Sequence, residues 1–189
     1  MVIARNARAL AVLSRHFRKH LVSKRYVALV VGDVEADGGA ITAPIGRDPD
    51  TRPRWRVMEI GKPAETRFTV IERLALSTLL ELEPVTGRTN QLRIHCAHIG
   101  HPIVGDETRE NGAAQTLNRA SENSAISEGI QEQNTESIIR PVSEPRLCLH
   151  AWKLAFHHPT SGERVEFNSG IPDSMAAVIA KYRLEESQR

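Results

Sequence analysis

Apolar and polar residues alternate along the chain in patterns that predict three helices. The first, over residues 7–20, repeats apolar side chains at about 100° per residue, which is typical of an amphipathic helix. The apolar residues expected to face a core are Leu10, Leu13, Phe17 and Leu21. The basic residues on the opposite face are Arg8, Arg15 and Lys19. Asn6 is predicted to cap this helix, and further helices are expected at 89–99 and 173–184.

Runs of β-branched and aliphatic residues predict a sheet. The continuous apolar run at 26–31 (YVALVV) is typical of a strand buried on both faces. Alternation at 64–74 and 77–83 predicts an antiparallel pair that is half-exposed to water. Further strand candidates lie at 2–4, 40–45, 147–156 and 164–168, with a weaker one at 55–60. The order of elements favours an α+β fold with a mixed, mainly antiparallel sheet flanked by helices.

Length and composition indicate a single domain spanning residues 1–189. The chain is 40% hydrophobic, which is enough for a core, and it has no apolar run of the roughly 18 residues that a transmembrane helix needs. Residues 107–145 lack periodicity and are rich in Ser, Asn, Gln, Glu and Gly. We therefore expect a disordered insertion there.

Charge is distributed unevenly, although the net charge is only +2. Residues 1–25 contain seven basic and no acidic residues, whereas 107–144 contain seven acidic and three basic ones. This asymmetry indicates a surface that attracts polyanions, and a solvated helix face is the alternative. A mitochondrial transit peptide is a further alternative, which the folded-looking sequence from the first residues onward disfavours.

The cysteines and histidines do not predict a metal site. Cys96 and Cys148 form no CxxC pair, which favours a reducing compartment such as the cytoplasm. The histidines at 150, 157 and 158 have no companion carboxylates at ligand spacing. Neither a metal nor a membrane partner is expected.

The block at 86–95 (TGRTNQLRIH) concentrates polar chemistry. It contains Arg88, Asn90, Gln91, Arg93 and His95 within eight residues. Thr86 and Gly87 predict a turn, and Thr89 is a candidate cap for the following helix. Free N–H groups and forked donors at a helix start suit phosphate or carboxylate, and an ordinary surface turn is the alternative. We expect His95 to be a hydrogen-bonded core residue rather than a base.

Tyr26 stands directly after Lys24 and Arg25. An aromatic ring beside two cations can stack on a nucleobase while the cations hold phosphates. The alternative is a tyrosine at the edge of the core. Because aromatic residues make up only 4% of the chain, a platform that stacks several bases is not expected.

Several blocks together resemble the RluA-type RNA pseudouridine synthase family (the RsuA/RluA-like catalytic domain). The most specific is TGRTNQLRIH followed by HPIVGD, within residues 84–106. The other matching segments are 4–20, 24–32 (KRYVALVVG), 61–70 (GKPAETRFTV) and 146–163. Asn90 stands where the family usually has histidine, and it keeps a polar donor and acceptor there.

The resemblance implies a pseudouridine synthase-like fold and an activity that isomerises uridine in RNA to pseudouridine without a cofactor. It implies that Tyr26 is the active-site tyrosine, that Arg93 is the basic residue that ion-pairs with a catalytic aspartate, and that Leu92 lines the pocket wall. The implied partner is ribosomal or transfer RNA. The residues expected to contact it are Arg8, Arg15, Lys19, Lys24, Arg25, Arg88, Asn90 and Gln91.

One feature of the family is absent from the sequence. The family's nucleophilic aspartate lies in an HRLDxxTSG motif, which this chain does not contain. The expectation is therefore an N-terminally incomplete domain, inactive alone, in which Arg93 has lost its partner and Arg93→Met barely alters stability. Asp106 is expected to have a structural hydrogen-bonding role. A non-catalytic RNA-binding remnant and an adaptor acting through 107–145 remain alternatives, and the RNA class, the target uridine and the oligomeric state stay open.

Overall fold

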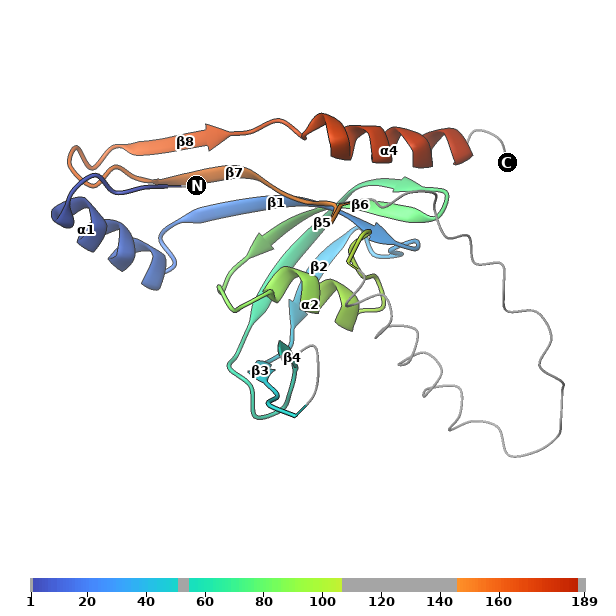
Figure 1. Cartoon of the computed structure of the whole chain (residues 1–189), viewed down its shortest axis with the longest axis horizontal. Helices are drawn as coiled ribbons and strands as arrows, with labels where there is room; N and C mark the ends of the chain where they lie inside the picture. The colour runs from blue at the N-terminus through green and yellow to red at the C-terminus, as the bar shows by residue number, and fades with distance from the viewer. Residues whose placement is uncertain (1, 51–54, 107–145, 187–189) are drawn as a thin grey trace, which may run out of the picture.

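The computed structural model describes residues 2–50, 55–106 and 146–186, and within them the chain forms an antiparallel sheet flanked by helices (Figure 1). The sheet has six strands in the order β2-β5-β6-β1-β7-β8, and every neighbouring pair is antiparallel. These strands are β1 (Ser23–Val31), β2 (Gly38–Thr42), β5 (Glu65–Leu74), β6 (Ser77–Pro84), β7 (Leu149–His157) and β8 (Arg164–Asn168). A separate hairpin joins β3 (Ile45–Arg47) to β4 (Trp55–Val57). This architecture confirms the predicted α+β class.

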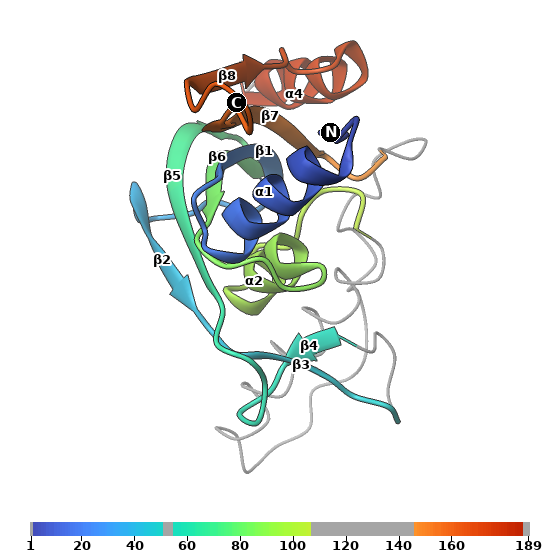
Figure 2. The same cartoon turned by 90° about the vertical axis from the view of Figure 1, so that its left-hand side faces the viewer.

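Three helices complete the described structure: α1 (Ala7–Arg18), α2 (Gln91–His98) and α4 (Asp173–Glu186). Helices α2 and α4 lie on opposite faces of the sheet, as Figures 1 and 2 show from two directions. The core between them contains Leu92 and Cys96 of α2 and Met175 and Ile179 of α4. Residues 27–30 of β1 are fully buried, which confirms that this strand is covered on both faces.

The predicted antiparallel pair of strands is present as β5 and β6, with Phe68 opposite Leu82 in the register. Strand β5 alternates between exposed and covered residues, as expected. Strand β6 does not, because most of its residues are buried. It lies between β5 and β1 and is packed against the core, so its polar residues Ser77 and Thr78 are buried as well.

Helix α1 forms where it is predicted, and the side chain of Asn6 accepts a hydrogen bond from the N–H of Ala9 at 2.9 Å. The predicted apolar side chains of α1 and of Leu21 just after it do not all face a core, and the sequence-based prediction is wrong for three of them. Those three, with their exposed fractions, are Leu10 (58%), Phe17 (43%) and Leu21 (54%). The physical reason is that α1 packs on the described chain through Leu13, in a small cluster separate from the main core.

The N-terminal residues 2–4 do not form a strand, contrary to the prediction. Val2 and Ala4 instead pack against the small cluster that contains Leu13 and Phe156, so side-chain burial rather than strand pairing holds this segment. The predicted insertion at 107–145 lies outside the described residues. None of the described helices contains an apolar stretch of the length that spanning a membrane requires.

Candidate active site

A pocket of about 220 Å³ opens between β1, the end of β6 and the start of α2. Its lining residues are Lys24, Tyr26, Pro84, Thr86, Gly87, Arg88, Asn90, Gln91, Leu92, Arg93 and Leu149. The structure thus brings together both residues that the sequence proposed as catalytic and half of those proposed to contact RNA, namely Lys24, Arg88, Asn90 and Gln91. Those that lie elsewhere are Arg8, Arg15, Lys19 and Arg25. Four lining residues were not among the predicted site residues: Thr86 and Gly87, which the sequence predicts only as a turn, and Pro84 and Leu149.

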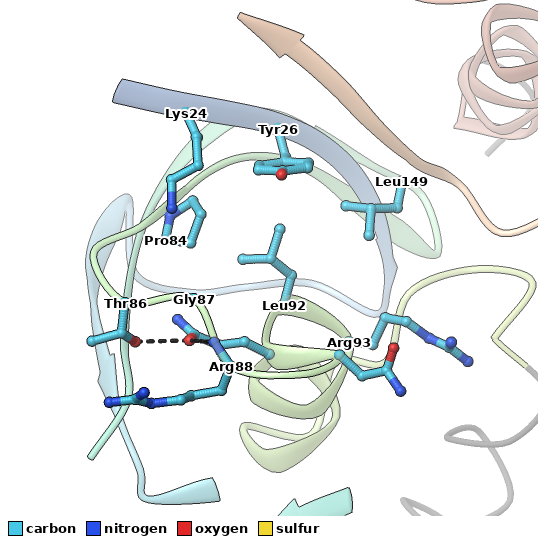
Figure 3. Close-up of a pocket in the computed structure, with 11 residues that line it drawn as sticks. Lys24, Tyr26, Pro84, Thr86, Gly87, Arg88, Leu92, Arg93 and Leu149 are labelled. Atoms are coloured by element: carbon cyan, nitrogen blue, oxygen red, sulfur yellow. Dashed lines mark hydrogen bonds between the residues drawn. The ribbon is translucent and has the colours of Figure 1, made fainter. Parts of the chain in front are cut away.

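The aromatic wall of the pocket comes from β1, where Lys24 and Tyr26 stand two residues apart on one face. Figure 3 shows Leu92 of α2 pointing toward the ring of Tyr26. Burial raises the pKa of the Tyr26 hydroxyl, so the phenol stays protonated at neutral pH. Burial lowers the pKa of the Lys24 ammonium. An uncharged aromatic ring, an aliphatic side chain and a cation therefore line the same pocket.

The turn before α2 is held from inside by Gln91, which is only 3% exposed. Its Oε1 accepts hydrogen bonds from the hydroxyl of Thr86 at 2.7 Å and the N–H of Arg88 at 2.9 Å. Its Nε2 donates to the carbonyl of Glu65 at 2.9 Å and to Oγ1 of Thr66 at 3.0 Å. All four hydrogen-bonding positions of this amide are therefore used within the protein.

The start of α2 differs from the sequence-based prediction. The helix begins at Gln91, because Asn90 has a left-handed backbone conformation (φ 54°) and is the cap residue in place of Thr89. The side chain of Asn90 makes no capping hydrogen bond. Asparagine tolerates this conformation better than most residues do, so its presence at this position suits the turn as well as a ligand.

His95 is a fully buried core histidine, as the sequence predicts. Its Nδ1 lies 2.9 Å from Oγ1 of Thr66, and its Nε2 lies 3.1 Å from the carbonyl oxygen of Ala43. Burial lowers the pKa of its imidazole below the ordinary value. The ring is therefore neutral at physiological pH and links α2 to β5 and to the segment after β2.

We expect this histidine to make stability depend on pH. An unfolded chain protonates His95 near its ordinary pKa of about 6.5, whereas the folded chain does so only at lower pH. The free energy of unfolding should therefore fall as the pH drops below about 6.5. Urea titrations between pH 5 and 8 on the wild type and on His95→Gln measure this effect. Identical pH dependence of the two proteins would contradict the prediction, and the exposed His98→Gln is the matched control.

Arg93 pairs with Asp106, so the sequence-based expectation that Arg93 has no partner in this chain is wrong. Its Nε donates to Oδ2 of Asp106 at 2.7 Å, and its Nη2 donates to Oδ1 at 2.5 Å. The Asp106 side chain is fully buried, and this bidentate pair raises the pKa of the Arg93 guanidinium. Asp106 thus has the structural role predicted for it. The sequence could not identify Arg93 as its partner, because the two residues lie on α2 and on the segment that follows it.

The remaining predicted RNA contacts lie on two surfaces. Arg8, Arg15 and Lys19 are exposed along α1 and just after its end. Arg25 is engaged by carboxylates of the neighbouring strand, since its guanidinium pairs with Glu81 and lies 3.3 Å from Glu83. Among the described residues, no group of three or more His, Cys, Asp and Glu could hold a metal ion.

Comparison with known proteins identifies the family. The family model described as RNA pseudouridylate synthase matches residues 1–98. Ribosomal large subunit pseudouridine synthase D of Nitrosomonas europaea is 37% identical over 183 residues, which are 97% of this chain and 47% of that protein. Dual-specificity RNA pseudouridine synthase RluA of Vibrio vulnificus is 40% identical over 167 residues, 85% of this chain and 56% of that one.

A solved structure agrees with these relatives. Human RNA Pseudouridylate Synthase Domain Containing 1 has a TM-score of 0.65 and 26% identity, covering 95% of this chain and 73% of that chain. The chain spans about half the length of the relatives that it matches by sequence. The matched sequence blocks, the antiparallel sheet and the pocket lead to one assignment. The chain belongs to the RNA pseudouridylate synthase family.

Proposed function

We propose that this chain supplies the base-binding wall and part of the RNA-binding surface of an enzyme that isomerises uridine in RNA to pseudouridine. The observation that carries the proposal is the pocket in which Leu92 faces the ring of Tyr26, with the ammonium group of Lys24 to one side. A uracil ring is flat and uncharged, so it suits a pocket lined by the Tyr26 ring and Leu92. Its attached phosphates suit Lys24 and Arg88 at the edge.

The chemistry requires that the target nucleotide leave its base stack before it reaches the pocket. Extrusion costs a few kcal/mol, and basic contacts to the flanking phosphates offset it. Within the pocket, Tyr26 packs on the base, and its protonated hydroxyl can relay a proton by donating its own as it accepts another. The bond between the ribose and a ring nitrogen of the base is broken, and the base is rejoined to the ribose through a ring carbon. That carbon loses its hydrogen as a proton, and the freed nitrogen gains one. No cofactor is needed, because the base keeps all of its atoms except for an exchanged hydrogen.

A nucleophile is the component that this sequence does not contain. In the family it is the aspartate of the HRLDxxTSG motif, and Arg93 is the residue that would ion-pair with it. Since Arg93 already binds Asp106, the incoming carboxylate would join an existing pair rather than meet a lone cation. That engagement also favours the second candidate, a non-catalytic RNA-binding module. Measuring tritium release from uridine-labelled RNA in the presence of the chain distinguishes the enzyme from the non-catalytic module.

RNA binding should be sensitive to salt and should depend on α1. Reversing Arg8, Arg15 and Lys19 to glutamate should make the slope of log affinity against log salt shallower by about 2, because each phosphate contact contributes about 0.7 for single strands. Filter binding of unmodified transfer RNA and large-subunit ribosomal RNA transcripts at several salt concentrations measures the slope. The matched control reverses three exposed basic residues elsewhere, namely Arg146, Arg164 and Lys181. Equal slopes for the two triple variants would place the RNA surface away from α1.

A further inference from the structure

The hydrogen bonds behind the pocket have only one self-consistent set of proton positions. The carbonyl of Ala43 can only accept, so Nε2 of His95 must carry the proton. The Nδ1 atom of the neutral ring is then an acceptor, and the hydroxyl of Thr66 must donate to it. The oxygen of Thr66 in turn accepts a hydrogen from Nε2 of Gln91. The donors and acceptors therefore run in one direction, from Gln91 inward to Ala43.

The same series of hydrogen bonds fixes the carbonyl end of the Gln91 amide, which faces the pocket. With Nε2 turned toward Thr66 and the carbonyl of Glu65, Oε1 is left to accept from Thr86 and from the N–H of Arg88. Turning the amide over would place two carbonyl oxygens together at Glu65 and two N–H groups together at Arg88. The orientation of one buried amide thus sets the shape of the turn that lines the pocket.

We propose that Gln91 is a positioning residue that holds the Thr86–Gly87–Arg88 turn in its RNA-binding shape, and that neutral His95, acting through Thr66, keeps Gln91 in the required orientation. The proposal rests on the RNA-binding function proposed above and assigns Gln91 a role behind the surface. Direct contact between this amide and RNA would require breaking at least one of its four hydrogen bonds within the protein.

Acid should weaken this arrangement. A second proton on His95 would face the oxygen of Thr66, which already accepts from Gln91, and the hydroxyl hydrogen of Thr66 would lose its acceptor. The titratable group that acts on the imidazole is His98, one turn along α2, and it opposes protonation. On the side of β5, the His95 ring contacts the hydroxyl of Thr66, which does not titrate. The charged group next to it in sequence is the Glu65 carboxylate, which pairs with Arg67. The turn should therefore be ordered at neutral pH and loosened in acid.

The first test needs no RNA. Nitrogen-15 spectra of the wild-type chain should show His95 as the neutral tautomer protonated at Nε2 at pH 7.5. Hydrogen exchange of the Arg88 amide, corrected for its intrinsic rate, should lose protection in step with protonation of His95. Either the opposite tautomer or a protection factor that ignores that titration would overturn the proposal.

Two variants test the role of the amide. Gln91→Met keeps the length of the side chain and removes all four hydrogen bonds, so the affinity for an unmodified ribosomal RNA transcript at pH 7.5 should fall about tenfold, the equivalent of about 1.4 kcal/mol. Gln91→Glu replaces the donor that faces Thr66 with a carboxylate, so the network lacks a proton at neutral pH. Acid supplies that proton either to the carboxyl group or to His95. Protection of the Arg88 amide should therefore be greater at pH 5.5 than at pH 7.5, the reverse of the wild type. A residue that only supports the fold would not reverse a pH profile.

The controls separate this proposal from the proposed function. His98→Gln removes the exposed neighbour and should keep the wild-type tautomer, protection and affinity at pH 7.5. If the wild-type chain binds no RNA, the function is wrong, and the exchange profile still decides the role of Gln91. If the wild type binds and Gln91→Met binds equally well with an unchanged protection factor, the positioning role is wrong.

Discussion

Replacing Arg93 by methionine is expected to lower the free energy of unfolding by about 3–5 kcal/mol, because it leaves the carboxylate of Asp106 buried without its cation. Asp106 is 1% exposed, and both of its oxygens accept hydrogen bonds from the guanidinium. Without the guanidinium, the carboxylate must either stay charged in a poorly solvated site or take up a proton. Urea denaturation at pH 7 with an unchanged m-value measures the loss.

A double-mutant cycle shows whether the pair itself is responsible. Adding Asp106→Leu to Arg93→Met removes the stranded charge, so the double variant should be more stable than Arg93→Met alone. The control is Arg164→Met, which breaks the exposed pair with Glu166 and should change stability little. A loss in Arg93→Met no larger than in Arg164→Met would mean that Asp106 does not depend on this guanidinium.

The elements of the fold follow closely from local patterns in the sequence. A continuous apolar run specified the central strand β1, and alternation specified the pairing of β5 with β6. Such patterns report which side chains avoid water, but not what covers them. Periodicity therefore located α1 correctly and still placed Leu10 and Phe17 in a core, although only Leu13 of its predicted apolar face is buried.

The candidate site could be predicted as far as its residues lie close together in sequence. The block at 86–95 and the residues beginning at Lys24 were recognisable from their composition and from a family resemblance. Their partners were not, because Thr66, Asp106 and Leu149 reach the site through sheet pairing and chain reversal. Sequence spacing also cannot show that Gln91, which it predicts as a contact to RNA, is buried and makes four hydrogen bonds within the protein.

Tyr26 is expected to be essential for turnover once a nucleophile is present. The chain alone should release no tritium from RNA labelled at the uracil carbon that becomes bonded to ribose, because nucleophilic chemistry needs an activated group in the pocket. Fusing to it a segment that carries the family's HRLDxxTSG motif should create activity, because that segment supplies the aspartate. Sustained tritium release by the unfused chain would contradict this view of the pocket.

Within that fusion, Tyr26→Phe should lower the rate of tritium release by about 10²–10⁴-fold, the usual contribution of a positioned proton-transfer group. RNA affinity should change little, because phenylalanine still packs on the base opposite Leu92. The matched control is Tyr182→Phe, which alters the other tyrosine of the chain on α4, outside the pocket. If Tyr26→Phe turns over as fast as Tyr182→Phe, the hydroxyl takes no part in proton transfer, and the ring serves only as a packing surface.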